Sequence, residues 1–167
     1  MLCAHGLGRI GWQAGSAASA LLSRADDADP EMRSSVSFAL SQIGISEPQA
    51  LSYLSKALQD PDPDTRRWVI SHLKDFDIDP VQLFPLLIPW VPRINDFRDQ
   101  HILTMLGDHP SESKDAVPHL GALIRDESRG AGLRIKAVET LWKIDRSGGP
   151  ILDVLTGARV RADQLGA

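Results

Sequence analysis

The chain has 167 residues, of which 43% are hydrophobic and 24% are charged, and its net charge is −4. This composition is typical of a soluble globular protein, and the acidic balance argues against a surface built for nucleic-acid phosphates, which usually needs a basic excess. The chain has one cysteine, so an internal disulfide is excluded. No stretch approaches the roughly 20 apolar residues of a membrane span, and residues 1–20 lack the pattern of a signal peptide. We therefore expect a cytoplasmic protein without a membrane segment.

A repeat of about 33 residues runs along the chain, a period that is characteristic of helical-repeat proteins. Two columns of leucine residues carry this repeat. The first column contains Leu7, Leu40, Leu73, Leu106 and Leu141, and the second contains Leu21, Leu54, Leu87, Leu120 and Leu155. Both columns slip by the same amount in the last interval, so a short insertion is expected in the turn at 126–134.

Each repeat contains two amphipathic patterns with a helical period. The first helix of the repeats is predicted at 14–24, 48–59, 80–91 and 114–125, and another is expected to begin at 150–156. The second helix is predicted at 30–43, 63–76, 94–107 and 132–145. Pro85 and Pro118 fall inside two of the first helices and are expected to kink them.

The second helices have an inward apolar stripe on which Ser37 and His109 are the polar exceptions. An arginine also falls on this stripe in three repeats, as Arg33, Arg66 and Arg134. An inward arginine needs a carboxylate partner, and the turns before the second helices supply acidic candidates. These candidates are Asp26, Asp27, Asp29, Asp60, Asp62, Asp64 and Asp126.

The third repeat departs from this pattern, because its register places Asp99 at the arginine position and Arg98 one place early. A ladder of Arg–Asp pairs would therefore be irregular there. We assign a structural role to Arg33, Asp60, Asp62, Arg66 and Arg134.

Two turns share the pattern Asp-Pro-(Asp/Glu)-x-x-Arg, at Asp29-Pro30-Glu31-Met32-Arg33 and at Asp62-Pro63-Asp64-Thr65-Arg66. The helix after the first turn ends in Ala39-Leu40-Ser41-Gln42-Ile43-Gly44, and a similar ending stands at Leu7-Gly8-Arg9-Ile10-Gly11. These residues resemble HEAT repeats, specifically the short type shared with phycocyanobilin lyase subunits. The resemblance implies an all-α fold, a right-handed α-α superhelix of helical hairpins.

We expect residues 1–167 to form a single HEAT-like solenoid. It would contain about three full repeats, in the register 12–44, 45–77 and 78–110 or 111–145, with partial units at both ends. Solenoids usually protect their ends with polar capping repeats, and neither end of this sequence has that character. We therefore expect the chain to be a piece of a longer solenoid.

The sequence lacks the common motifs of catalytic and metal sites, including the nucleophile elbow, the phosphate loop and His-Glu-x-x-His. Cys3 and His5 have no second pair at zinc spacing, and His72 is expected to pack beside the next repeat. The acidic turns at 26–29 and 60–64 lack the glycine and final glutamate of a calcium loop, so we interpret them as helix caps. We predict a non-catalytic protein without a metal or cofactor.

The resemblance places the second helices along a concave face, which usually carries out binding in solenoids. Phe38, Trp68 and Trp142 lie on the outward stripe of these helices, and large exposed aromatic residues are typical of binding hot spots. The candidate binding residues are Phe38, Arg67, Trp68, Ser71, His101, Lys136 and Trp142. Trp12 and Trp90 lie at junctions between helices and are expected to pack there.

The leading hypothesis is a HEAT-type scaffold that binds a protein or peptide partner through this face. The family resemblance alone also suggests a chromophore (phycobilin) lyase-like subunit, although the one cysteine lies in a partial repeat. A third hypothesis is a nucleic-acid-binding helical-repeat protein, which is disfavoured because the outward stripe is nearly balanced in charge. The sequence indicates neither the identity of the partner nor the oligomeric state.

Overall fold

The computed structural model describes residues 2–95 and 100–146. Within these ranges every regular element is a helix, so the expectation of an all-α fold built from helical hairpins is confirmed. The chain divides into two compact units, Met1–Leu83 (unit 1) and Phe84–Ala167 (unit 2). Among the helices that are described, none is long and apolar enough to span a membrane.

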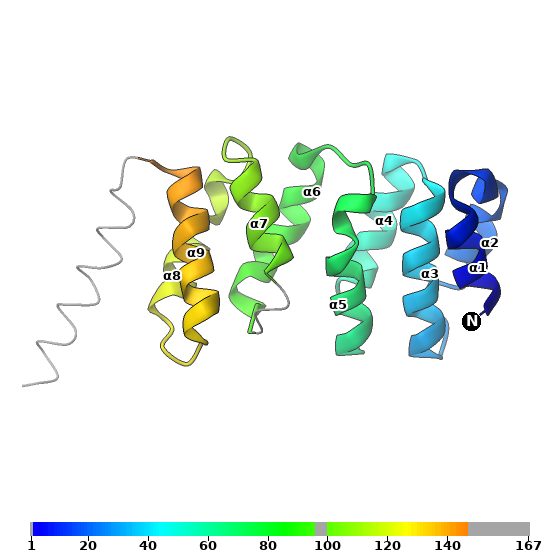
Figure 1. The fold of residues 1–167 in the computed structure, drawn as a ribbon, viewed down its shortest axis with the longest axis horizontal. Coiled ribbons are helices and arrows are strands. Elements are labelled where there is room, and N and C mark those ends of the chain that lie inside the picture. Colours follow the sequence, from blue (N-terminus) through cyan, green and yellow to red (C-terminus); the bar gives the residue numbers. More distant parts are fainter. Residues whose placement is uncertain (1, 96–99, 147–167) are drawn as a thin grey trace, which may run out of the picture. The chain divides into compact units, whose positions relative to one another are not determined.

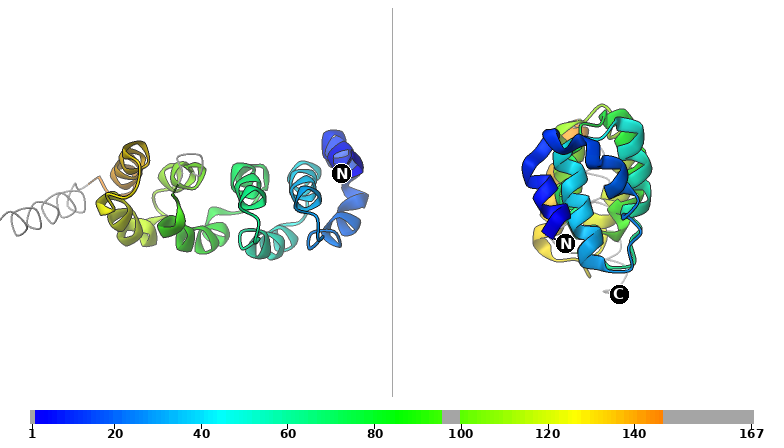
Figure 2. Two further views of the ribbon diagram at one scale, coloured as in Figure 1. Left: turned by 90° about the horizontal axis from the view of Figure 1, so that it is seen from below. Right: turned by 90° about the vertical axis from the view of Figure 1, so that its right-hand side faces the viewer.

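Unit 1 has two layers of helices. Helices α1 (Leu2–Ile10), α3 (Pro30–Ile43) and α5 (Pro63–Ser71) lie side by side in one layer (Figures 1 and 2). Helices α2 (Ala18–Leu22) and α4 (Glu47–Ala57) form the other layer. We call the outer surface of α1, α3 and α5 the second-helix face of unit 1, because these are the second helices of their hairpins.

Short 3-10 segments connect these helices. They are η1 (Gly11–Ala17), which precedes α2, and η2 (Leu73–Asp75), which follows α5. Helix α6 (Pro80–Leu87) begins in unit 1 and continues into η3 (Ile88–Arg93). In unit 2, η5 (Lys114–Ala116) leads into α8 (Val117–Arg125), and α9 (Ala131–Ile144) packs against both α8 and α7 (His101–Asp108).

Helices α3 and α5 begin in the same way, because each has an aspartate as its cap and a proline as its first residue. The Asp29 carboxylate accepts a hydrogen bond from the Glu31 N–H at 2.9 Å, and the Asp62 carboxylate accepts one from the Thr65 N–H at 2.6 Å. The proline that follows each aspartate has no N–H to leave unpaired in the first turn. Helix α3 ends at Gly44, whose φ of +72° is a conformation that favours glycine. The sequence thus marks both ends of this helix.

The inward stripe of the second helices forms the core of unit 1. Val36, Leu40, Val69 and Leu73 are completely buried there. Burial of such side chains is the main stabilising contribution available to a two-layer helical array. Ser37, one of the two polar exceptions, is also buried.

His109, the other exception, does not follow the prediction. It comes after the end of α7, where it is exposed, and its ring forms an edge-to-face pair with Phe84 at a centroid distance of 5.7 Å. The inward stripe of α7 therefore ends at Leu106, because the helix stops at Asp108.

Several predicted helices are shorter or less regular than expected. The predicted helix at 14–24 is divided between η1 and α2, and the one at 63–76 becomes a 3-10 turn after Ser71. Pro118 is one of the first two residues of α8, so the predicted kink there is wrong, since no hydrogen bond of a preceding turn is lost. Arg98, Asp99 and the helix expected at 150–156 lie outside the described residues.

Candidate binding surface

Arg33 links two successive corners of unit 1, a corner being the turn before a second helix. Its Nε and Nη2 atoms donate to the two carboxylate oxygens of Asp60 at 2.6 and 2.8 Å. Its Nη1 atom donates to the carbonyl oxygens of Asp27 and Ala28, at 2.8 and 3.2 Å. The side chains of Arg33 and Asp60 are only 12% and 7% exposed, so the two residues form a nearly buried, bidentate ion pair. The Asp60 carboxylate raises the pKa of Arg33 through its hydrogen bonds.

Arg66 repeats part of this arrangement one repeat later. Its Nη1 atom donates to the carbonyl oxygens of Asp60 and Pro61, which match in register the two carbonyls that Arg33 contacts. Each arginine therefore fastens the start of its helix to the corner before it. Arg33 has the additional carboxylate of the following corner.

Asp62 completes the corner of α5. Besides the Thr65 N–H, its carboxylate accepts a hydrogen bond from the Thr65 hydroxyl at 2.9 Å. The backbone and side-chain hydrogen bonds from Thr65 hold the pKa of Asp62 below its usual range. The same hydroxyl lies 3.3 Å from the Pro30 carbonyl oxygen, so the beginnings of α5 and α3 are tied together.

The corner before α9 in unit 2 uses a different partner. The Asp126 carboxylate accepts hydrogen bonds from the hydroxyl and N–H of Ser128, and from Arg129 Nε at 2.8 Å. These bonds, those from Ser128 first, lower the pKa of Asp126 to about 2. Arg129 also donates to the carbonyls of Ile94 and Pro92, whereas Arg134 donates to the Ile124 carbonyl at 3.0 Å.

A groove of about 360 Å³ lies on the second-helix face of unit 1. We call it the aromatic groove, and it is lined by His5, Pro30, Glu31, Ser34, Ser35, Phe38, Asp62, Asp64 and Trp68. Two of the predicted binding residues, Phe38 and Trp68, therefore line one groove. They come from neighbouring helices, α3 and α5, and their ring centroids are 6.5 Å apart in an edge-to-face arrangement.

Two histidines that were not among the predicted binding residues add their rings to those of Phe38 and Trp68. His5 stacks on Phe38 at a centroid distance of 4.6 Å, and His72 stacks on Trp68 at 4.7 Å with the rings nearly parallel. His72 Nδ1 also lies 2.9 Å from the Trp68 carbonyl oxygen, which fixes the ring. His5 occupies in its repeat the register of Phe38, one repeat length earlier, and this shared position could have revealed it. Four rings from α1, α3 and the α5–η2 segment thus form one row.

The remaining candidates of unit 1 lie beside this row. Arg67 Nη1 contacts the Asp64 carboxylate at 2.5 Å, and the Ser71 hydroxyl donates to the Arg67 carbonyl at 2.9 Å. The hydroxyl of Ser71 is therefore used within its own helix. Trp68 itself is 43% exposed.

The other three candidates lie in unit 2. His101 is exposed at the start of α7, and Lys136 pairs with Glu139 on α9 at 3.5 Å. Trp142 is 51% exposed, and Ile135, two helical turns earlier on the same side of α9, is 60% exposed. The outer surface of α7 and α9, which we call the second-helix face of unit 2, therefore has exposed apolar residues of its own.

The two tryptophans that were expected to pack at junctions behave differently. Trp12, in η1, is 78% exposed, so the prediction for it is wrong, because most of the residue faces solvent instead of a junction. Trp90 is half-buried, and the Arg93 guanidinium lies 4.8 Å from its ring centroid.

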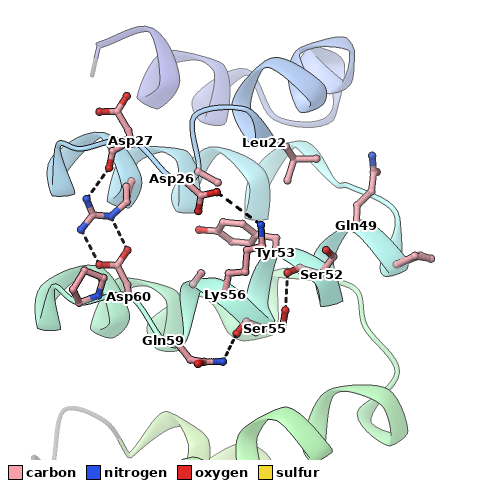
Figure 3. A pocket seen from close by; sticks show the side chains of 15 residues that line it. Leu22, Asp26, Asp27, Gln49, Ser52, Tyr53, Ser55, Lys56, Gln59 and Asp60 are labelled. Atoms are coloured by element: carbon pink, nitrogen blue, oxygen red, sulfur yellow. Dashed lines mark hydrogen bonds and ion pairs between the residues drawn. The ribbon is translucent and has the colours of Figure 1, made fainter.

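A larger cavity of about 1010 Å³ lies on the opposite layer of unit 1, along α2 and α4 (Figure 3). Most of the residues that line it have polar side chains, among them Asp26, Gln49, Tyr53, Lys56 and Asp60. Tyr53 is buried, and this burial raises its pKa to about 12. Asp26 and Lys56 form only an exposed pair at 3.8 Å. Among the described residues, no cluster of histidine, cysteine and acidic side chains is suited to hold a metal ion.

The profile of the HEAT-repeat family matches residues 2–88, which is more than half of the chain. The chain belongs to the HEAT-repeat family. No curated protein matches it. HEAT repeats commonly serve as scaffolds for protein interactions and are typically non-catalytic. In this HEAT-repeat chain the matched segment contains both the Arg33–Asp60 corner and the aromatic groove.

Proposed function

We propose that this protein is a non-catalytic HEAT-repeat scaffold that binds a protein or peptide partner through the second-helix faces of its repeats. The observation that carries the proposal is the aromatic groove, in which Phe38 and Trp68 lie together beside serine and acidic residues. Tryptophan is enriched among the residues that dominate protein-binding energies. Single apolar residues scattered over a surface are ordinary, whereas a large exposed ring beside a groove indicates an interaction site.

The rings are held in place before any partner arrives. Trp68 is stacked on His72 and forms an edge-to-face pair with Phe38, which is stacked in turn on His5. A side chain that is already ordered loses less conformational entropy on binding, so more of the contact energy contributes to affinity. This favours a binding role for the row over a merely solvated one.

The corners explain how the face is presented. Arg33 and Thr65 connect the start of α3 to the start of α5 through Asp60 and the Pro30 carbonyl. These links set how the outward sides of α3 and α5 lie beside each other. We therefore assign the corner residues to the scaffold and the outward residues to binding.

We extend the proposal to the second-helix face of unit 2. Trp142 and Ile135 supply its exposed apolar stripe, and His101 and Lys136 flank it with polar groups. This face is the second candidate contact region of the same scaffold.

To test the proposal, a displayed library of random peptides is selected for binding to the full chain. Peptides selected on the wild type are then measured against Trp68→Ala, with Trp12→Ala as a matched control for an exposed tryptophan outside the groove. Trp68→Ala should weaken binding by about tenfold or more, with unchanged helical content by circular dichroism, and Trp12→Ala should not. Selected peptides that bind Trp68→Ala and Trp142→Ala as well as the wild type would contradict the proposal.

The two other hypotheses from the sequence, a phycobilin lyase-like subunit and a nucleic-acid-binding protein, stay predictions. None of the described features favours either of them over protein binding.

A further inference from the structure

One edge of the aromatic groove is acidic. Glu31 and Asp64 lie in the first turns of α3 and α5, and Asp62 is the residue that caps α5. All three line the same groove as Phe38 and Trp68. First-turn acidic residues also stabilise their own helices, so their charge alone does not mark a site. What distinguishes this edge is its position next to the exposed Trp68 and the partly buried Phe38.

The spacing along each helix places an acidic and an aromatic residue on the same side of that helix. Asp64 and Trp68 are four residues apart on α5, and Glu31 and Phe38 are seven apart on α3, with Ser34 and Ser35 between them. Residues at these separations lie on one side of a helix. A ligand in the groove would therefore contact ring surface and carboxylates at once.

We infer that the aromatic groove receives an arginine or lysine side chain of the partner, packed on Trp68 and paired with the carboxylates of Glu31 and Asp64. This inference rests on the proposed function and names the chemistry of its partner. The faces of aromatic rings carry negative potential and attract cations, tryptophan most strongly. His72 already occupies one face of Trp68, and the residue as a whole is 43% exposed, which leaves surface for a second contact.

The charge of the groove selects a cation over the other classes of side chain. Its lining has three carboxylates, of which Asp64 pairs with Arg67 and Asp62 lies in the field of Arg33, whereas the part of the lining that the structure describes contains no lysine or arginine. An acidic partner would meet like charge, and a purely apolar one would desolvate carboxylates without replacing their hydration. A cationic side chain satisfies both the rings and the carboxylates.

The Asp64–Arg67 pair leaves room for this ligand. The Asp64 side chain is 77% exposed, and exposed ion pairs contribute little stability. A second cation can therefore share this carboxylate without disrupting a structural contact. The Asp62 carboxylate, in contrast, is engaged by Thr65, so it adds charge to the groove while keeping its place in the corner.

The test uses short glycine-serine peptides with one variable central residue, added to the full chain labelled with nitrogen-15. The central residue is arginine, its neutral analogue citrulline, lysine, acetyl-lysine, leucine or glutamate. The indole N–H signal of Trp68, assigned with Trp68→Phe, reports binding, and that of Trp12 is the internal control. We expect the arginine and lysine peptides to shift the Trp68 signal with at least about tenfold higher affinity than citrulline and acetyl-lysine.

Charge variants complete the test. Glu31→Gln combined with Asp64→Asn should reduce the affinity for the arginine peptide by about tenfold, whereas Glu127→Gln, an exposed acidic residue of unit 2, should leave it unchanged. Added salt should weaken binding in the wild type.

Two results would overturn the inference, and they differ in what they say about the proposed function. If leucine and citrulline peptides shift Trp68 as strongly as arginine, the groove binds partners but does not select a cation, and the scaffold proposal stands. If no peptide of the set shifts Trp68 and the peptides from the displayed library bind independently of Trp68, both proposals fail.

Discussion

The corner aspartates of the two units make the same local turn, but each binds a different arginine. In unit 1, Asp60 accepts the Asp62 N–H and also binds Arg33, which lies 27 residues earlier in the preceding second helix. In unit 2, Asp126 accepts the Ser128 N–H in the same local turn, but its arginine is Arg129, only three residues away. The aspartate turn is thus retained, while the long-range ion pair is replaced by a local one.

This difference separates two interactions of a corner: the turn that the aspartate makes locally, and the bond that an arginine makes between repeats. An aspartate that accepts the N–H two residues later makes a turn wherever it occurs, and Asp27 does the same with Asp29 at 3.0 Å. The bond between repeats depends on an arginine at the matching register. Where the register carries none, as predicted for the third repeat, Arg129 reaches instead for the carbonyls of Ile94 and Pro92.

The largest expected effect comes from removing the arginine of each corner. Arg33→Ala leaves a nearly buried Asp60 carboxylate without its partner and should cost about 3 kcal/mol of unfolding free energy. Arg129→Ala removes a partly exposed pair and two carbonyl contacts, and should cost about 1 kcal/mol. Urea unfolding measures both, with Arg9→Ala, an exposed arginine of α1, as the control. Equal losses for Arg33→Ala and Arg129→Ala would erase the distinction between the corners.

Substitutions at two glycines test how closely the second helices approach each other, one glycine in each unit. A Cβ atom at Gly8 would lie 2.8 Å from the Phe38 ring and 3.0 Å from the Ala39 Cα, so neither ring nor backbone can yield easily. Gly8→Ala should cost about 2 kcal/mol through overpacking, reduced by the helix propensity of alanine. At Gly107 the Cβ would meet the flexible end of Lys143 at 2.9 Å. Gly107→Ala should therefore be nearly neutral in the same unfolding assay, and a larger loss for it than for Gly8→Ala would contradict the packing described for α1 and α3.

Tyr53 gives a signal from unit 1 alone, because it is the one tyrosine of the sequence. Burial raises its pKa to about 12, so folding favours the neutral phenol. The stabilisation is complete below the unfolded pKa of about 10 and is lost as the pH rises towards 12. Ultraviolet absorbance of the tyrosinate should show ionisation near pH 12 in the folded chain. Ionisation near pH 10 without unfolding would mean that Tyr53 is solvated and that α4 does not pack as described.

The smallest expected effect is the loss of stability at acidic pH that depends on Asp126 in the unit 2 corner. The pKa of Asp126 is lowered to about 2 in the folded state, so its contribution is present above the unfolded pKa of about 4 and is lost as the pH falls towards 2. Asp126→Asn should therefore reduce the difference between urea midpoints measured near neutral pH and near pH 3. An acid dependence identical to that of the wild type would show that Ser128 and Arg129 do not stabilise the ionised carboxylate.

The parts of this fold that could be predicted are those written locally in the sequence. The bounds of α3 follow from Asp29, Pro30 and Gly44, because a cap, a proline and a glycine with positive φ mark the ends of a helix in any context. The α5 helix was overestimated beyond Ser71, since the leucine columns indicate which residues face inward but not where the α-helical hydrogen bonding gives way to a 3-10 turn.

The candidate site was predicted only in outline for a similar reason. Phe38 and Trp68 stood out as large rings on an outward stripe, but the stacking of His5 and His72 on them depends on the distance between neighbouring helices. The choice of Asp60 among seven candidate carboxylates for Arg33 likewise depends on how one hairpin stacks on the next. Register identifies a set of residues, whereas packing selects the pair.

The most direct test of the central claim measures peptide affinity and unfolding free energy on the same preparation of Trp68→Ala. If the corners build the scaffold and the outward rings bind the partner, the affinity for a selected peptide should fall by about tenfold or more. The unfolding free energy should fall by only about 1 kcal/mol or less. A preparation that loses several kcal/mol of stability, yet binds the peptide like the wild type whenever it is folded, would show that Trp68 is a core residue and would contradict the account.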